Sequence, residues 1–215
     1  MSTEFEVILF DLDGTLTDSK PGIVACIRHT LEQLEIEIDA GIDLETYIGP
    51  PLEDTFTSLC ADIDVTRAIR IYRERYSSTG LYENSVYHGI EACLEKLGTR
   101  AESMFVATSK PTVYSERIIA HFGLGRYFKM IYGSHLDGRL GNKAELLSHL
   151  LQQENISASD AVMIGDRKFD IIGARSNSIH SVGVLWGYGS EQELHDAGAD
   201  DLCRHPDQLY PCLFG

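Results

Sequence analysis

The fold of this chain is decided by residues 7–16, which read VILFDLDGTL. The first four residues are apolar and mostly branched, a pattern typical of a buried β-strand. Two aspartates separated by one residue end the run, and Gly14 permits a sharp bend away from the sheet. Two carboxylates at one strand end repel each other. The stretch therefore indicates a bound cation, a shared proton or a catalytic role.

Short apolar runs alternate with amphipathic segments in the second part of the chain. This alternation predicts right-handed βαβ units and a parallel sheet covered by helices on both faces. The first strand, residues 6–10, belongs to the same sheet. The predicted strands that follow are 104–108, 130–133, 161–165, 181–185 and 201–203, and the predicted helices are 89–97, 111–122, 143–154, 168–176 and 191–197, with a helical tail.

Residues 19–80 show only helical patterns, so they form an all-α insertion into the α/β core. Ser19 is expected to cap the first helix, and Pro21 suits its first turn. Asp43 is expected to cap a short helix that ends at the rigid loop formed by Gly49, Pro50 and Pro51. The predicted domains are a discontinuous core, residues 1–16 and 85–215, and a helical insertion, residues 17–84.

Composition narrows the class of protein. The chain has 215 residues, 43% apolar and 24% charged, which is ordinary for a globular protein. Its formal net charge of -15 argues against nucleic-acid polymers and anionic membrane surfaces as partners. No apolar run reaches the roughly 20 residues of a membrane span. The five cysteines lack CxxC spacing and are expected to be reduced thiols of a cytoplasmic protein.

Polar side chains follow three of the predicted strands. In a parallel sheet, ligands bind beyond the carboxyl ends of the strands, so these side chains are expected to lie close together. Each aspartate alone fits a turn or a helix cap, Thr108 alone fits a helix cap, and Lys143 alone fits a solvated helix face, so only their joint placement indicates a site. They are Asp11 and Asp13 after the first strand, Thr108, Ser109 and Lys110 after the run 104–107, Asp166 and Asp170 after the run 161–164, and Lys143 at the start of a helix.

The chemistry of this set is that of phosphate transfer. Carboxylates are the oxygen ligands that Mg²⁺ prefers, and a hydroxyl, backbone N–H groups and a lysine bind phosphate oxygens. One aspartate can attack phosphorus, and the other can move the proton. Asp11 and Asp13 share a side of an extended segment because they are two residues apart.

These motifs resemble those of the haloacid dehalogenase-like hydrolases, specifically the phosphatase branch, and the resemblance covers nearly the whole chain. Residues 11–16 match the first motif, Thr108 the second, Lys143 the third and residues 165–170 the fourth. The resemblance implies a Rossmann-like α/β core, a bound Mg²⁺ and an aspartyl-phosphate intermediate.

The resemblance also implies a role for each site residue. Asp11 is the nucleophile, and Asp13 is the acid and base whose carbonyl oxygen also binds the metal. Asp11 and Asp166 give carboxylates to the metal, and Asp170 is either a further ligand or a residue that holds the ligands. The implied phosphate-binding residues are Thr108, Ser109, Lys143 and Gly14.

The insertion stands where the family places its α-helical cap, a mobile lid over the site. The loop of Pro50, Pro51 and Leu52 is expected to face the site if that geometry holds, and Arg73 is a candidate reader of an anionic group. Trp186 and Tyr188 are expected to pack at the base of a glycine-flanked loop.

The substrate is expected to be a small phosphorylated metabolite, handled by a monomer or a homodimer. Residues 107–111, 132–134 and 183–190 resemble a 5′-nucleotidase-like subgroup that borders the phosphoglycolate phosphatases. Nucleoside 5′-monophosphates are therefore the first prediction and 2-phosphoglycolate the alternative. A sugar phosphomutase and a non-catalytic phosphate-binding domain also stay open.

Overall fold

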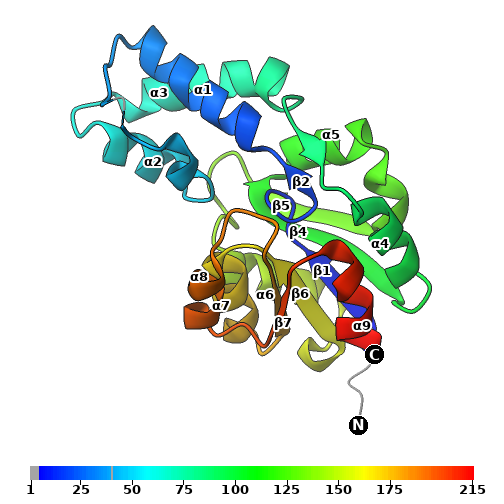
Figure 1. Ribbon diagram of the computed structural model, residues 1–215. Helices are drawn as coiled ribbons and strands as arrows, with labels where there is room; N and C mark the ends of the chain where they lie inside the picture. Colours follow the sequence, from blue (N-terminus) through cyan, green and yellow to red (C-terminus); the bar gives the residue numbers. More distant parts are fainter. Residues whose placement is uncertain (1–4, 40) are drawn as a thin grey trace. The chain divides into compact units, whose positions relative to one another are not determined.

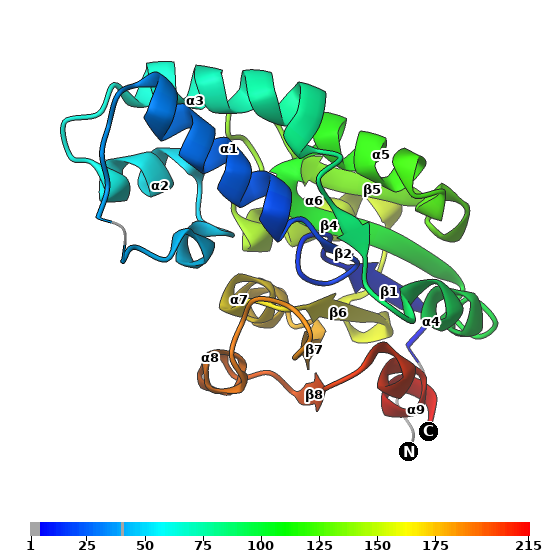
Figure 2. The ribbon, with the colours of Figure 1, turned by 45° about the horizontal axis from the view of Figure 1, so that its top comes forward.

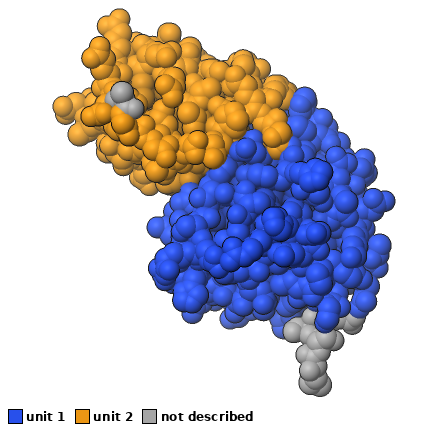
Figure 3. Space-filling view, in the orientation of Figure 1, with its two compact units in different colours: residues 1–18, 86–215 blue, residues 19–85 orange. Residues whose placement is uncertain are grey.

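The computed structural model describes residues 5–39 and 41–215. Residues 1–4 and 40, which the sequence assigns to the core and the insertion, lie outside the described residues. The chain divides into two compact units, residues 1–18 with 86–215 and residues 19–85 (Figure 3). It passes between them at β2 (Thr17–Asp18) and β3 (Ser85–Val86), which pair as a small two-stranded sheet.

The larger unit is built on one parallel sheet, as predicted (Figure 1). Among the described residues its strand order is β5-β4-β1-β6-β7-β8. All four residues of β1 are buried, and β1 pairs with both β4 and β6. The strands are β1 (Val7–Phe10), β4 (Ser103–Pro111), β5 (Met130–Ser134), β6 (Ala161–Gly165), β7 (His180–Val184) and β8 (Asp201–Cys203).

Helices cover both faces of this sheet because the crossovers run outward from β1 in two directions (Figure 2). One face is covered by α4 (Ile90–Leu97), α5 (Thr112–His121) and α9 (Leu209–Phe214), and the other by α6 (Lys143–Glu154), α7 (Lys168–Ser176) and α8 (Glu191–Ala197). Leu146, Leu147 and Leu150 of α6 pack on β1, β4 and β6 through Leu9, Phe105 and Met163. This buried layer fixes the strand ends that carry the site.

Apart from Ser85, which begins β3, the elements of the smaller unit are helical in its described residues, and it holds its own aromatic core. Phe56 meets Tyr72 edge-on at 6.2 Å between ring centroids, and Tyr72 stacks on Tyr76 at 5.5 Å. Its elements are α1 (Lys20–Gln33), η1 (Leu44–Tyr47), α2 (Leu52–Leu59), α3 (Val65–Arg75) and the π-turn η2 (Tyr76–Gly80).

Two predicted details are wrong. Ser19 occupies the N-cap position of α1, but its side chain makes no capping hydrogen bond because its backbone is already helical. β4 continues to Pro111, three residues beyond the predicted strand end at Thr108, because Pro111 still pairs with Ser134 after a register shift. The Asp43 cap is confirmed, since its side chain accepts from the Glu45 N–H.

Three short 3-10 turns complete the described chain, η3 (Leu124–Tyr127), η4 (Ala158–Asp160) and η5 (Pro206–Gln208). Within the described residues, none of the helices has both the length and the apolar character that a membrane crossing requires.

Candidate active site

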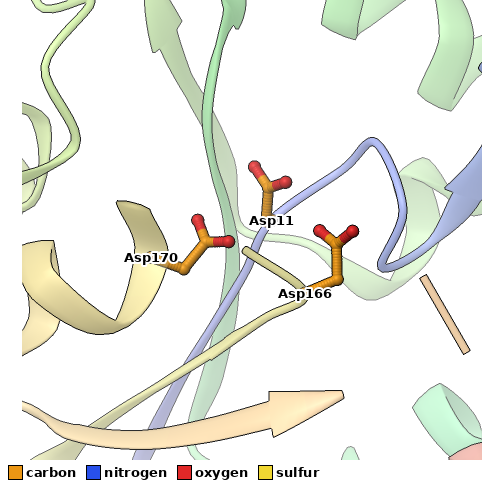
Figure 4. A group of neighbouring side chains, drawn as sticks. All are labelled: Asp11, Asp166 and Asp170. Atoms are coloured by element: carbon orange, nitrogen blue, oxygen red, sulfur yellow. The ribbon is translucent and has the colours of Figure 1, made fainter. Parts of the chain in front are cut away.

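Three buried carboxylates converge at the carboxyl end of the sheet (Figure 4). Asp11 directly follows β1, Asp166 follows the neighbouring β6, and Asp170 lies in the first turn of α7. One oxygen from each lies within 4.8 Å of one from the others. The exposed fractions are 8% for Asp11, 0% for Asp166 and 2% for Asp170. The parallel pairing of β1 and β6 therefore brings together acids that lie more than 150 residues apart in the chain.

Burial makes Asp11 and Asp166 hard to ionise. Desolvation raises the pKa of Asp11 to about 6; the nearby Lys143 opposes this shift, and the charge of Asp170 adds to it. The pKa of Asp166 is raised well above its usual value by burial first and then by the charges of Asp170 and Asp11. A cation among the three would favour their ionised forms.

Lys143 supplies one positive charge to this cluster. Its Nζ lies 2.8 Å from Oδ1 of Asp11, 2.7 Å from Oδ1 of Asp170 and 2.8 Å from the carbonyl oxygen of Ala107. Burial disfavours its ammonium, but the two carboxylates outweigh that effect and raise its pKa. Asn142 positions Lys143 as the first residue of α6, because its side chain caps the helix by accepting from the N–H groups of Ala144 and Glu145.

One lysine cannot neutralise three carboxylates. The donor set is made only of hard oxygens, it is buried, and it keeps an excess of negative charge when all three acids are ionised. These properties fit a hard divalent cation such as Mg²⁺.

Two backbone N–H groups and one side-chain hydroxyl hold Asp166 and Asp170 in place. The N–H of Tyr188 donates to Oδ2 of Asp166 at 2.7 Å, and the Thr15 hydroxyl donates to Oδ1 at 3.5 Å. The N–H of Arg167 donates to Oδ2 of Asp170 at 3.1 Å. Gly165 leaves the room that Asp170 needs, because a Cβ there would lie 2.3 Å from its Cγ.

Asp13 has a lysine of its own. Nζ of Lys110, from the end of β4, lies 2.7 Å from the Asp13 carboxylate. The Asp13 side chain is 18% exposed and the Lys110 side chain 8%. Sequence reasoning placed Lys110 in the cluster of strand-end residues but gave it no role. The available signal was its spacing, since residues 108 and 110 share a side of an extended strand.

The predicted phosphate-binding residues lie at the adjoining strand end. Thr108 is buried on β4, one residue after the Ala107 carbonyl that accepts from Lys143. Its Oγ1 accepts from the Lys110 N–H at 3.3 Å, and the Ser109 carbonyl accepts from the Ser134 hydroxyl at 2.7 Å. Gly14 has a φ of +81°, and a Cβ there would lie 2.1 Å from Oδ2 of Asp166.

The loop after β7 supports the first motif, a role that sequence reasoning missed. Nε1 of Trp186 donates to the Thr15 carbonyl at 2.9 Å. The Tyr188 hydroxyl donates to Oδ1 of Asp18 at 3.1 Å, while its backbone N–H holds Asp166. The indication in the sequence was the run of glycines around two aromatic residues directly after a strand end.

The predicted substrate-reading residues all belong to the unit of residues 19–85. Pro50 and Pro51 precede α2, Leu52 is its first residue, and Arg73 lies in the last turn of α3. That they face Asp11 stays a prediction.

Comparison with known proteins identifies relatives along most of the chain. A 5′-nucleotidase of Pseudomonas aeruginosa is 46% identical over 189 residues, which are 87% of this chain and 86% of that protein. The tyrosine-protein kinase PtkA of Mycobacterium tuberculosis is 40% identical over 185 residues, which are 86% of this chain and 63% of the kinase. The chain thus spans less than two thirds of the kinase.

A crystal structure described as a predicted phosphatase from Clostridium acetobutylicum has the same fold, with a TM-score of 0.91, 41% identity and 98% coverage of both chains. The family model described as haloacid dehalogenase-like hydrolase matches residues 8–184. This match spans more than half of the chain and includes both the Asp11 stretch and the Asp166 loop. The chain therefore belongs to the haloacid dehalogenase-like hydrolases, a family of enzymes.

Proposed function

We propose that this protein is a Mg²⁺-dependent phosphomonoesterase that works through a phosphoryl group on Asp11. The observation that carries the proposal is the buried cluster of Asp11, Asp166 and Asp170 around Lys143, with Asp13 held apart by a second lysine. The names of the relatives, 5′-nucleotidase and phosphatase, support the same reaction class.

Solvent access separates the attacking acid from the supporting acids. The Asp11 side chain is 12% exposed, whereas that of Asp170 is 3% exposed and Asp166 is fully buried. Lys143 binds Oδ1 of Asp11. Oδ2 is thus the oxygen that attacks a bound phosphate, and Asp166 and Asp170 are too deep to reach it.

The reaction has two displacement steps. In the first, Oδ2 of Asp11 attacks phosphorus, the bond from phosphorus to the ester oxygen breaks, and Asp13 gives its proton to the departing alcohol. In the second, Asp13 takes a proton from water, the water oxygen attacks phosphorus, and the Asp11–phosphorus bond breaks. Inorganic phosphate leaves, Asp11 is restored and Asp13 is protonated again.

The remaining site residues bind and orient. Asp11, Asp166, Asp170 and the Asp13 carbonyl oxygen would hold Mg²⁺, which when bound offsets the charge of the phosphate and the acids. Lys143 and the Thr108 hydroxyl bind oxygens of the transferring phosphoryl group, and the N–H of Ser109 adds a donor. The N–H of Gly14, also predicted to bind phosphate, instead donates to the Thr17 carbonyl at 2.8 Å. In this scheme the Lys143 ammonium exchanges hydrogen bonds to the carboxylates for hydrogen bonds to the phosphoryl oxygens without leaving the acidic cluster.

The proposed substrates are nucleoside 5′-monophosphates, because the alignment with the relative named 5′-nucleotidase covers most of this chain and most of that protein. The cap residues Pro50, Pro51, Leu52 and Arg73 would read the leaving group. The alternative substrate is 2-phosphoglycolate. The similarity to PtkA makes phosphorylation of protein tyrosine by ATP the competing activity.

The test is phosphate release by the purified chain with Mg²⁺ and with EDTA, over nucleoside monophosphates, 2-phosphoglycolate and sugar phosphates. We expect Mg²⁺-dependent release that Asp11→Asn abolishes and that the exposed control Asp196→Asn retains. A fully active Asp11→Asn variant would refute the proposal. A requirement for a sugar bisphosphate activator would favour a phosphomutase, and tyrosine phosphorylation without phosphate release would favour a kinase.

A further inference from the structure

Two lysines serve the two aspartates of the first motif separately. Lys143 binds Asp11 and Asp170, whereas Lys110 binds Asp13. The Lys110 ammonium lies 2.7 Å from Oδ1 and 2.7 Å from Oδ2 of Asp13, so it bridges both oxygens. A carboxylate rotates readily about its last torsion, which is broad. A cation on both of its oxygens restricts that rotation.

We propose that Lys110 is a positioning residue that fixes the Asp13 carboxylate for proton transfer, a proposal that rests on the proposed function. Orientation is a large part of what an acid–base group contributes, because a misplaced proton donor loses its advantage. Each Asp13 oxygen can still exchange a proton, since a carboxylate has about four lone-pair sites and Lys110 occupies two of them.

The location of Lys110 makes the contact rigid. Its side chain is 8% exposed, and a buried ammonium depends on its partner because the unpaired charge is costly. Its own N–H donates to Oγ1 of Thr108, which lies two residues earlier on β4. Lys110 therefore links Asp13, which follows β1, to the phosphate-binding residue Thr108 of the neighbouring strand β4.

This role predicts a dependence on the leaving group. The alkoxide of a nucleoside 5′-monophosphate needs a proton to depart, whereas the phenolate of p-nitrophenyl phosphate leaves without one. Because kcat/KM covers the steps up to alcohol departure, a disordered Asp13 lowers kcat/KM for the nucleotide and spares it for the aryl ester. Hydrolysis of phospho-Asp11 needs Asp13 with either substrate, so kcat falls for both.

The experiment measures kcat and KM for both esters in Lys110→Met, Lys110→Arg, Asp13→Asn, the double variant and the exposed control Lys96→Met. We expect Lys110→Met to lose about 10- to 100-fold in kcat/KM for the nucleotide, within the usual contribution of acid–base catalysis. For the aryl ester we expect kcat and KM to fall together, leaving kcat/KM within about threefold of wild type. Lys110→Arg should restore most of the nucleotide activity.

The double variant tests whether Lys110 acts through Asp13. If it does, adding Lys110→Met to Asp13→Asn lowers kcat/KM for the nucleotide by less than about threefold more. The ratio of kcat/KM for the two esters does not depend on the folded fraction, so the test holds even for a poorly folded variant.

Equal losses of kcat/KM on both esters, or a multiplicative loss in the double variant, would overturn the role of Lys110 and leave the phosphatase proposal intact. A wild-type protein that releases no phosphate from these two esters, from 2-phosphoglycolate or from sugar phosphates would instead overturn the proposed function, and the role of Lys110 with it.

Discussion

Lys143→Met is the substitution that most severely perturbs the charge balance of the acidic cluster. Methionine keeps much of the length of the side chain and removes its charge, which leaves Asp11 and Asp170 buried without the ammonium that now lies 2.8 and 2.7 Å away. Removing one partner of a buried ion pair costs about 3–5 kcal/mol. For a chain of this size that corresponds to a fall in melting temperature of about 6–20 °C.

The loss should depend on pH. The pKa of Asp11 is already raised to about 6 in the folded protein, above its value of about 3.9 in the unfolded chain. Ionising Asp11 therefore costs stability as the pH rises through 6, and protonating it restores stability below that pH. Without Lys143 this cost grows, so the deficit of Lys143→Met should be larger at about pH 7.5 than at about pH 5.

The assay is thermal unfolding in EDTA, followed by the fluorescence of the one tryptophan in the sequence. Trp186 donates to the Thr15 carbonyl beside the site and so reports on the unit that contains it. The matched control is Lys129→Met, whose lysine is 60% exposed and pairs with Glu154, and which should cost at most about 1 kcal/mol. A Lys143→Met protein with the same melting temperature as this control at about pH 7.5 would refute the reasoning. A decrease in melting temperature relative to wild type that is no smaller at about pH 5 would also refute it.

Three further outcomes follow from the same geometry. Mg²⁺ should raise the melting temperature more at about pH 7.5 than at about pH 5, because protons compete with the metal for Asp11 near its pKa of about 6; equal shifts would contradict this. Gly14→Ala should lose Mg²⁺-dependent phosphate release, because its Cβ would lie 2.1 Å from Oδ2 of Asp166. The control is Gly123→Ala, where φ is +68° but the added Cβ would have no atom within 4 Å; it should cost only about 1–2 kcal/mol of stability and keep activity. If the two alanine variants lost activity to a similar extent, the clash with Asp166 would not be the cause. Tyr188→Phe removes the hydroxyl that donates to Asp18 and keeps the N–H that donates to Asp166. This variant should lose about 1 kcal/mol of folding stability and keep its Mg²⁺ affinity in titration calorimetry. A tenfold loss of Mg²⁺ affinity, about 1.4 kcal/mol, would contradict this expectation.

Elements bounded by strong local signals could be predicted from the sequence. The strand β6 and the helix α6 begin and end where their patterns predict, because an apolar run ends at Gly165 in one case and Asn142 caps the helix in the other. The parallel sheet followed from the alternation of strands and helices, and the carboxyl ends of its strands indicated where the polar residues meet.

Features that depend on pairing between distant segments could not be predicted. β4 extends past its apolar run only because β5 lies beside it and Pro111 pairs with Ser134. The contact of Lys110 with Asp13 requires that β4 and β1 be neighbours, and the support of Asp166 by Tyr188 requires the loop after β7. No local pattern of residues encodes these distances.

Asp170 is a single residue whose role could not be assigned from the sequence. The sequence left it either as a metal ligand or as a residue that holds the ligands. In the structure one oxygen binds Lys143 and the other caps α7 through the Arg167 N–H, while the side chain also lies among the three acids that could hold a metal.

The central claim is that Asp11 carries the phosphoryl group, and acid-quenched mass spectrometry of a single turnover with a nucleoside 5′-monophosphate and Mg²⁺ tests it most directly. The account predicts a protein heavier by one phosphoryl group, with the adduct on the peptide that contains Asp11. With p-nitrophenyl phosphate, whose phenolate leaves without a proton, Asp13→Asn should increase the amount of this adduct, because its phospho-Asp11 lacks the base that activates water. Full turnover with no adduct, or an adduct on another residue, would contradict the claim.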